Sequence, residues 1–219
     1  MTAPASRPVL ENRHARLEPL SFDHVEALVR AATADRTTFD LAPVPRDRAE
    51  MVGYVERALA DERAGRALPF ATIAPATGAV VGSIRLMSLE WWSWPAGPIH
   101  VAGEPRRADA GQPPDVAEIG HAWLEAAAQR TAVNTAACLL LMTHAFDAWH
   151  VHRLVLKTDE RNRRSRAAIE RLGGRLEGIL RAHLPAADGT IRNTALYAIL
   201  PGEWPEVRKR LERPLGSPL

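Results

Sequence analysis

The order of elements between residues 117 and 158 constrains the fold of this chain more than any other feature of its sequence. Ala117–Leu124 has the pattern of a strand, Val133–Trp149 is a long and almost wholly apolar helix, and Val151–Thr158 is again strand-like. Two strands joined through a helix lie parallel in one sheet, and an apolar helix is buried on most of its sides. The sequence therefore predicts an α/β fold with helices packed on a central sheet.

The segments before this unit predict an antiparallel front to the same sheet. Arg13–Leu20 alternates apolar and polar residues, and Phe70–Ala74 and Val80–Met87 are two strands joined by a tight turn. Two helices are expected after the first strand, one capped by Ser21 and one begun by Asp47.

The segments after the unit predict one more helix, a hairpin and a closing helix. Asn162–Leu172 has helical spacing, and Glu203–Leu211 closes the chain as a short helix. Between them, Leu176–Leu184 and Thr190–Leu200 form a hairpin turned by Asp188-Gly189. The whole pattern predicts a mixed sheet with an antiparallel front and a parallel crossover behind it.

The length of 219 residues favours one domain. We expect a flexible N-terminus over residues 1–12, a single domain over 13–212 and a tail over 213–219. Within that domain, residues 88–115 contain five prolines, three glycines and three tryptophans, Trp91, Trp92 and Trp94. Such a stretch predicts a long loop insertion, of the kind that often forms a lid or a binding surface.

Charge and cysteine content exclude several classes of protein. A net charge of +2, from 28 basic and 26 acidic residues, is too small to indicate a nucleic-acid partner. No apolar run approaches the ~20 residues of a membrane span, and Met1–Pro8 has no apolar signal segment. The single cysteine, Cys138, lies in the apolar helix and is expected to be an inert core thiol. We therefore expect a cytoplasmic protein that binds neither nucleic acid nor membrane.

The most specific chemistry follows the strand at Ala117–Leu124. The stretch Gln129–Thr135 reads Gln-Arg-Thr-Ala-Val-Asn-Thr and leads into the apolar helix. Small and polar residues at a helix start present backbone N–H groups, and together with the helix dipole these favour a phosphate or pyrophosphate. Arg130 adds a fork-shaped cation. On the residues alone this is a phosphate-site hypothesis, because most loops of this kind bind nothing.

Several motifs then occur in order along the chain. Glu118–Leu124 reads Glu-Ile-Gly-His-Ala-Trp-Leu, and it is followed by His144-Ala145-Phe146, His152–Asp159, Asn162–Gly173, Glu177–Arg181 and Glu203-Trp204-Pro205. With these motifs the chain resembles the GNAT superfamily of acyl-CoA-dependent N-acyltransferases, and its RimJ/RimL-like branch most. The resemblance covers Arg13–Leu211, and its specific part is Glu118–Leu200.

The resemblance implies a site as well as a fold. It implies a central sheet splayed open between the strands at Glu118–Leu124 and Val151–Thr158, with acetyl-CoA as co-substrate in that wedge and no metal. Backbone groups of Trp123 and Leu124 would pair with the pantetheine amide, and Asn162 would reach the pantetheine arm. The pyrophosphate would lie on the loop residues Gln129, Arg130, Thr131, Ala132, Val133, Asn134 and Thr135.

Two departures from the family pattern bear on function. The family loop usually has glycines where this chain has Thr131–Asn134, so side chains must share the phosphate contacts. Many members also have a tyrosine on the helix at Asn162–Leu172 that protonates the leaving thiolate. The two tyrosines of this chain, Tyr54 and Tyr197, lie elsewhere, and Ser165 stands where RimL-like members place a serine.

Direct attack of a neutral amine on a thioester needs a base, N–H donors for the oxyanion and an acid for the thiolate. Glu118 is the candidate base, acting directly or through water; the alternative is a structurally paired strand carboxylate. Ser165 is the candidate acid, or else a helix-surface serine. His121, three residues after Glu118, is expected on the opposite face of the sheet.

Other polar and aromatic residues stay open to two interpretations. His150 and His152 would share one side of a strand, but no third ligand is indicated, so no metal site is predicted. Trp91, Trp92 and Trp94 are either a wall of the acceptor pocket or surface packing that includes a homodimer contact. Their loop is expected beside the acceptor end of the wedge.

The sequence thus predicts an N-acetyltransferase that transfers the acetyl group of acetyl-CoA to a primary amine, either a protein N-terminus or a small-molecule amine. The alternative is a catalytically weak acyl-CoA-binding module, which the missing tyrosine and the altered loop would suit. A structural dimer partner is a third hypothesis, and it rests only on the Trp-rich loop.

Overall fold

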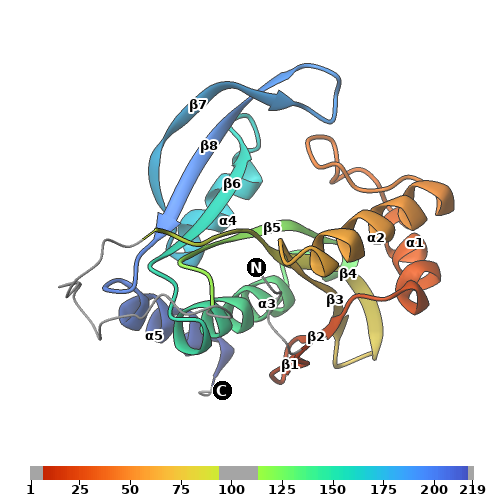
Figure 1. Ribbon diagram of the computed structural model, residues 1–219. Helices are drawn as coiled ribbons and strands as arrows, with labels where there is room; N and C mark the ends of the chain where they lie inside the picture. The colour runs from red at the N-terminus through yellow and green to blue at the C-terminus, as the bar shows by residue number, and fades with distance from the viewer. Residues whose placement is uncertain (1–6, 94–112, 217–219) are drawn as a thin grey trace.

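The computed structural model describes residues 7–93 and 113–216, and an eight-stranded sheet is its central feature (Figure 1). The spatial order is β1-β2-β3-β4-β5-β6-β8-β7, in which β5 and β6 pair in parallel and every other neighbouring pair is antiparallel. The strands are β1 (Leu10–Glu11), β2 (Arg16–Pro19), β3 (Leu68–Ala74), β4 (Ala79–Glu90), β5 (Val116–Leu124), β6 (Arg153–Asp159), β7 (Arg175–Pro185) and β8 (Ile191–Ile199).

Helices cover both faces of this sheet. One face carries α1 (Val25–Thr33) and α2 (Arg48–Arg63), whose buried residues form a core with Leu20 and Trp123. The other face carries α3 (Ala132–Thr143), α4 (Arg163–Leu172) and α5 (Trp204–Leu215), which bury the larger core. Because side chains alternate along a strand, this division shows which face each β5 side chain points to.

The mixed α/β fold predicted from the sequence is confirmed, and so are its local signals. Ser21 caps the short 3₁₀ turn that leads into α1, and the Asp47 side chain accepts the Glu50 backbone N–H at the start of α2. The turn of the last hairpin contains Gly189 in the left-handed region, with φ 79°. Ser21 and Asp47 satisfy backbone N–H groups a few residues away, and Gly189 permits a backbone conformation that other residues avoid.

Several element ends differ from the expected ones. β4 continues to Glu90, where Glu90 pairs with Val116, so the first residues of the expected insertion belong to the sheet. The apolar helix ends at Thr143 and continues as a π-helical turn over His144–Ala148. α5 continues to Leu215, whose side chain is buried in the larger core. In each case pairing or burial extends an element past the point where its sequence pattern fades.

The start of β6 also differs from the prediction. β6 begins at Arg153, so His150 and His152 precede the strand, and His150 has a φ of 54°. The two histidines therefore do not share one side of a strand, contrary to the prediction from the sequence. The His150 ring contacts the Phe146 carbonyl through Nδ1 at 3.2 Å, whereas His152 stacks on Trp92 with ring centroids 5.7 Å apart.

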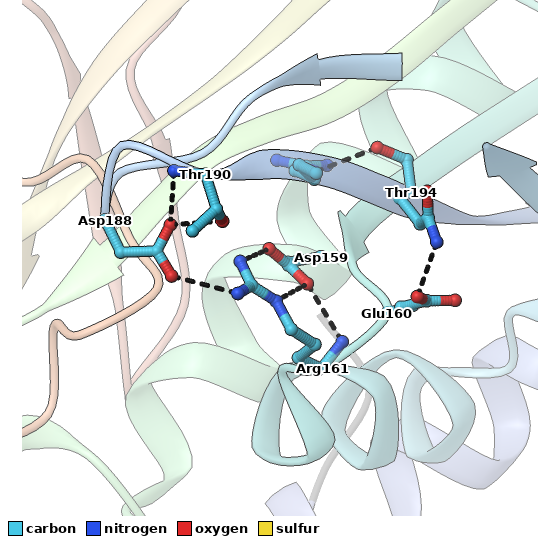
Figure 2. Close-up of polar contacts among 8 residues, drawn as sticks. Asp159, Glu160, Arg161, Asp188, Thr190 and Thr194 are labelled. Atoms are coloured by element: carbon cyan, nitrogen blue, oxygen red, sulfur yellow. Dashed lines mark hydrogen bonds and ion pairs between the residues drawn. The ribbon is translucent and has the colours of Figure 1, made fainter. Parts of the chain in front are cut away.

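An ion-pair network fixes the turn of the β7–β8 hairpin to the end of β6 (Figure 2). The Arg161 guanidinium donates to both oxygens of Asp159, at 3.0 and 2.7 Å, and to Asp188 Oδ2 at 2.9 Å. Asp188 also accepts the backbone N–H and hydroxyl of Thr190. Every charge of this trio therefore has an opposite partner, and the hairpin turn is held beside the N-terminal end of α4.

Candidate active site

The sheet opens between β5 and β6, which produces the wedge that the resemblance implied. The parallel pairing runs from Val116↔Arg153 to Ile119↔Leu156 and stops there. Beyond that point β5 stays paired with β4 as far as Leu124, while β6 stays paired with β8 as far as Asp159. Figure 1 shows β6, β8 and β7 rising away from β5. The backbone of β5 past Ile119 thus faces a gap that an extended ligand can enter as an added strand does.

A β-bulge lies in β5 where this opening begins. Ser83 pairs with Trp123 and Arg85 with Gly120, so β5 holds one residue more than β4 between the two pairs. The extra residue is accommodated at His121, whose φ is 47°. A bulge of this kind redirects the side chains that follow it.

The bulge overturns the prediction that His121 lies on the opposite face from Glu118. Ala117 and Ile119 belong to the larger core, so Glu118 between them points to the face of α1 and α2. The His121 ring contacts the Tyr54 ring of α2 at 6.0 Å, which places it on that same face. Desolvation by the surrounding protein and, secondly, the charge of Arg85 lower the pKa of His121, although the side chain stays partly open to solvent. The imidazole is therefore uncharged at neutral pH.

Glu118 is buried, with 8% of its surface exposed, and it forms an ion pair. Lys157 Nζ donates to Glu118 Oε2 at 2.8 Å across the parallel strands. A Cβ at Gly120 would clash with Met87 and lie 3.4 Å from Glu118 Oε1, so glycine lets the Met87 side chain lie against β5 beside the carboxylate. Lys157, which the sequence analysis left without a role, holds this oxygen in place.

The loop Gln129–Thr135 follows β5 and starts α3 at the open end of the wedge. Thr131 is the helix N-cap: its hydroxyl accepts the Val133 N–H at 3.3 Å and donates to the Ala128 carbonyl at 2.7 Å. Gln129 Nε2 donates to the Leu124 carbonyl and to Thr38 Oγ1. These two side chains hold the loop through structural contacts that the sequence did not predict.

Arg130 differs from its neighbours in this loop. It is exposed and has a φ of 61°. Among the residues that the structure describes, its side chain makes no hydrogen bond and no ion pair. Val133 is buried, and Ala132, Asn134 and Thr135 are half-buried on the first turn of α3. An exposed cation and a helix N-terminus thus lie together where the expected pyrophosphate would be.

The start of α4 brings Asn162 and Ser165 together. Asn162 is the N-cap, and its Oδ1 accepts the Ser165 backbone N–H at 3.0 Å. Both residues are half-buried. The amide oxygen of Asn162 therefore supports the helix, while its contact with a pantetheine arm and the acid role of Ser165 remain predictions.

The hydroxyls of both tyrosines are engaged. Tyr54 donates to Ser83 Oγ at 3.1 Å in a buried position. Tyr197 is fully buried, accepts from Arg166 Nε at 3.0 Å and donates to Glu170 Oε1 at 3.2 Å. Neither phenol is thus placed as the acid of a thiolate leaving group, which agrees with the departure noted in the sequence.

Arg85 lies beside the candidate site, and the sequence analysis did not single it out. It lies on β4 opposite Gly120, and only 3% of its surface is exposed. Its guanidinium carbon lies 4.8 Å from the centroid of the Tyr54 ring. Nε has no hydrogen-bond partner, and no ion pair joins Arg85 to any residue in the described ranges. The signal was present, because Val80–Met87 is an apolar strand that a single arginine interrupts.

A cleft of about 630 Å³ opens beside Tyr54 on this face of the sheet. Its walls come from the α1–α2 loop, from α2 and from the β7–β8 turn, as Phe39, Tyr54, Arg57 and Ala187 show. The hairpin turn that Arg161 holds in place is therefore one side of this cleft. Phe39 also packs against Trp123 of β5, with ring centroids 6.1 Å apart.

Trp91 and Trp92 of the expected insertion lie at the closed end of the wedge, where β5 and β6 are paired. Trp91 and Trp92 follow the Glu90↔Val116 pair, beside the start of β6 where the strands are closed. Trp92 is 42% exposed and its backbone N–H donates to Asp115 Oδ2. Trp94 and the rest of the insertion up to residue 112 lie outside the described residues. A pocket wall and a dimer contact both remain predictions for this loop.

The remaining reactive side chains have structural environments. Cys138 is buried in α3, and burial raises the pKa of its thiol to about 12, as expected for an inert core cysteine. Over residues 7–93 and 113–216, no group of three or more His, Cys, Asp or Glu side chains is arranged to hold a metal ion. In the same ranges no helix is long and apolar enough to cross a membrane.

Comparison with known proteins gives one family. The family model described as "Acetyltransferase (GNAT) domain" matches residues 14–175. A curated relative, "Putative ribosomal N-acetyltransferase YdaF" of Bacillus subtilis, is 34% identical over 88 residues. That alignment spans 40% of this chain and about half of the relative, 47% of its length.

Solved structures agree over nearly the whole chain. A GCN5-related N-acetyltransferase from Brucella melitensis superposes with a TM-score of 0.76 at 28% identity, covering 97% of this chain and 88% of that one. RimJ of Mycobacterium smegmatis, solved in complex with CoA-disulfide, gives a TM-score of 0.70 at 25% identity, covering 91% and 88%. The similarity therefore includes β7, β8 and α5, which lie beyond the region matched by the family model.

Proposed function

The chain belongs to the acetyltransferase (GNAT) domain family, and from that premise we propose that it transfers the acetyl group of acetyl-CoA to a primary amine. One observation carries the proposal: the parallel pairing of β5 and β6 stops at Ile119↔Leu156. The opening therefore begins next to Glu118 and extends toward the loop at Gln129–Thr135. A ligand in that wedge would have its phosphates at one end and its acyl group near a buried carboxylate.

The residues present fit acetyl-CoA. Past Ile119 the β5 backbone has no β6 partner, so an amide-bearing arm can pair with it at Trp123 and Leu124, where the Leu124 carbonyl also accepts from Gln129 Nε2. Arg130 and the first turn of α3 offer a cation and a positive helix end to a pyrophosphate. When bound, acetyl-CoA supplies an activated acyl group with a thiolate leaving group.

Glu118 is the proposed base. The acceptor enters as an ammonium and must lose a proton before its nitrogen can attack. Glu118 Oε1 lies near Gly120 and Met87, while Oε2 is held by Lys157. Lys157 thus orients the carboxylate and leaves one oxygen toward the site, where it accepts the proton directly or through water.

Ser165 is the proposed acid at the other side of the wedge. Its position is fixed by the Asn162 cap at the start of α4. A thiolate is a good leaving group, so this contribution is expected to be smaller than that of the base. The acceptor class within the proposal is a protein N-terminus or a small-molecule amine, and the curated relative named as a putative ribosomal N-acetyltransferase supports the first.

An acyl-CoA-binding module without catalysis is the second candidate function. The engagement of both tyrosine hydroxyls, with Ser83 and with Glu170, favours it. The two candidates predict the same CoA binding and differ in turnover.

Two measurements on the same preparation test the proposal. Calorimetry gives the affinity for CoA, and thiol release from acetyl-CoA is followed with a panel of peptide N-termini and small amines. We expect CoA binding together with amine-dependent thiol release and an acetylated product by mass spectrometry. CoA binding without amine-dependent release would instead support the binding module, and absence of CoA binding would refute both.

A further inference from the structure

The proposed acetyl transfer leaves one strong feature of the site unexplained, namely a buried cation without a counter-ion. Arg85 is 3% exposed, and within the described residues its guanidinium makes no hydrogen bond or ion pair. Desolvating a charge without pairing it is costly. Its contact with the Tyr54 ring recovers only part of that cost. A buried cation that persists under these conditions indicates a function for the charge.

The surroundings of Arg85 show where that charge acts. Tyr54, which the guanidinium contacts, lines the 630 Å³ cleft, and the partly exposed His121 ring also contacts Tyr54. Arg85 pairs with Gly120 across the strands, and the neighbouring Met87 side chain lies over Gly120 beside Glu118. Glu118 lies two residues before Gly120 on β5, about 7 Å along the strand. Arg85 and Glu118 are therefore diagonal neighbours on the same face of the sheet.

The charge balance of this region is positive. Lys157 pairs with Glu118, and the charges of Asp159 and Glu118 act on Arg192 from β6 and β5. Asp159 is itself committed to Arg161. Arg57 at the cleft wall and Arg85 below it both lower the pKa of His121, and Asp61 opposes them. The cleft is lined by three arginines and two carboxylates, Arg36, Arg46, Arg57, Asp40 and Glu50, and Arg85 adds one more positive charge beside it.

We propose that Arg85 binds a carboxylate of the acceptor, so that the amine acetylated at this site carries a carboxylate near its nitrogen. The proposal rests on the acetyl transfer proposed above and names its substrate class. A guanidinium pairs with a carboxylate through two parallel N–H donors, which fixes both position and orientation. The ammonium would then lie at Glu118 Oε1 beside Met87, while the carboxylate satisfies Arg85. The carboxylate could be the α-carboxylate of a free amino acid or the side chain of an acidic N-terminal residue.

Binding tests the proposal without depending on turnover. In the presence of CoA, calorimetry compares N-acetyl-L-glutamate with N-acetyl-L-glutamine amide, which lacks both carboxylates. We expect wild-type protein to bind the acid about 10–100-fold more tightly, as a charge-assisted pair predicts. Arg85→Gln should abolish this difference, and Arg85→Lys, which keeps the charge but not the fork, should retain part of it. Arg208→Gln removes an arginine that is paired with Asp147 and Glu212 on α5, and it should change nothing.

Turnover then identifies the source of the carboxylate. One arm compares free L-amino acids with their carboxamides, and the other compares amidated peptides beginning with Asp or Glu with those beginning with Asn or Gln. A preference for the acid in one arm, lost in Arg85→Gln, assigns that source. An equal loss of rate on acids and amides would instead show that Arg85 acts on the thioester and would overturn the proposal.

The two proposals fail in different ways. If amines of both kinds release CoA equally and both ligands bind equally, Arg85 is not a carboxylate site although acetyl transfer stands. If no amine releases CoA but the acid still binds through Arg85, acetyl transfer fails while the carboxylate site stands. A preference for the acid that persists in Arg85→Gln would also overturn the assignment.

Discussion

Arg161 and Arg85 both lie next to residues that line the cleft, Arg161 through Asp188 beside Ala187 and Arg85 through Tyr54, but their charges are paired differently. Arg161 is partly exposed and is bound by Asp159 and Asp188, as Figure 2 shows. Arg85 is far more deeply buried and has no such partner among the described residues. A charge that is paired within the protein stabilises the fold, whereas a buried charge without a protein partner indicates a ligand site. The comparison separates the hairpin side of the cleft, which is structurally complete, from the β4–β5 side, which awaits a ligand.

The largest expected effect concerns the one carboxylate on the β4–β5 side. Glu118→Gln keeps the shape of the side chain and removes the charge, so kcat should fall about 10²–10⁴-fold with CoA affinity little changed. Steady-state thiol release and calorimetry measure the two quantities. The pH dependence of kcat should also change, because the variant has no carboxylate at this position to accept the proton.

Glu177→Gln is the matched control for that experiment. Glu177 is also a strand carboxylate in an ion pair, but it pairs with Arg153 on the exposed face of β7. It should leave kcat unchanged within about twofold. Equal rates for Glu118→Gln and wild type would assign proton removal to solvent or to another residue.

The next effect concerns the unpaired cation of the phosphate loop. Arg130→Ala should weaken CoA binding by about 1.5–3 kcal/mol, because a charge-assisted contact with the pyrophosphate is lost. The binding constant should also lose part of its salt dependence. Arg208→Ala, which removes a paired arginine, serves as the control. An unchanged dissociation constant in folded Arg130→Ala would remove this residue from the site.

The smallest effect is expected on the hairpin side, in acid. Hydrogen bonds from Thr190 and the Arg161 ion pair lower the pKa of Asp188 to about 2. A lowered pKa in the folded state stabilises the fold above the usual carboxyl pKa near 4, and that contribution is lost as the pH falls toward 2. Asp188→Asn should therefore show a shallower loss of stability than wild type between pH 4 and pH 2. Denaturant unfolding at a series of pH values measures it, and parallel curves would show that the contact contributes nothing.

Most of the fold could be predicted because its signals are local. The parallel crossover over residues 117–158, the caps at Ser21 and Asp47 and the turn at Gly189 each depend on residues within a few positions. The wedge itself came from resemblance to a family, since no local pattern states where two parallel strands separate. The start of β6 was misplaced because His150 adopts a left-handed conformation that its sequence does not announce.

The site was harder to predict because its contacts are distant. One inserted residue turns His121 to the face of Glu118, and alternation counted along the sequence cannot register such a bulge. Gln129 bonds to Thr38, 91 residues away. The arginine at position 85 is visible in an apolar strand, but the absence of a partner for it is a property of three dimensions.

Replacing Arg161 and Arg85 in turn with methionine tests most directly whether Arg161 is paired within the protein while Arg85 is not. Arg161→Met leaves Asp159, whose side chain is 2% exposed, without its cation, so the free energy of unfolding should fall by about 1–3 kcal/mol. Arg85→Met removes the desolvated charge and keeps a side chain of similar length, so the ligand-free protein should be as stable as wild type or more stable. Denaturant unfolding of the three proteins at pH 7 gives the values. A loss of stability in Arg85→Met as large as that in Arg161→Met would show that Arg85 is satisfied by the protein itself and would contradict the account.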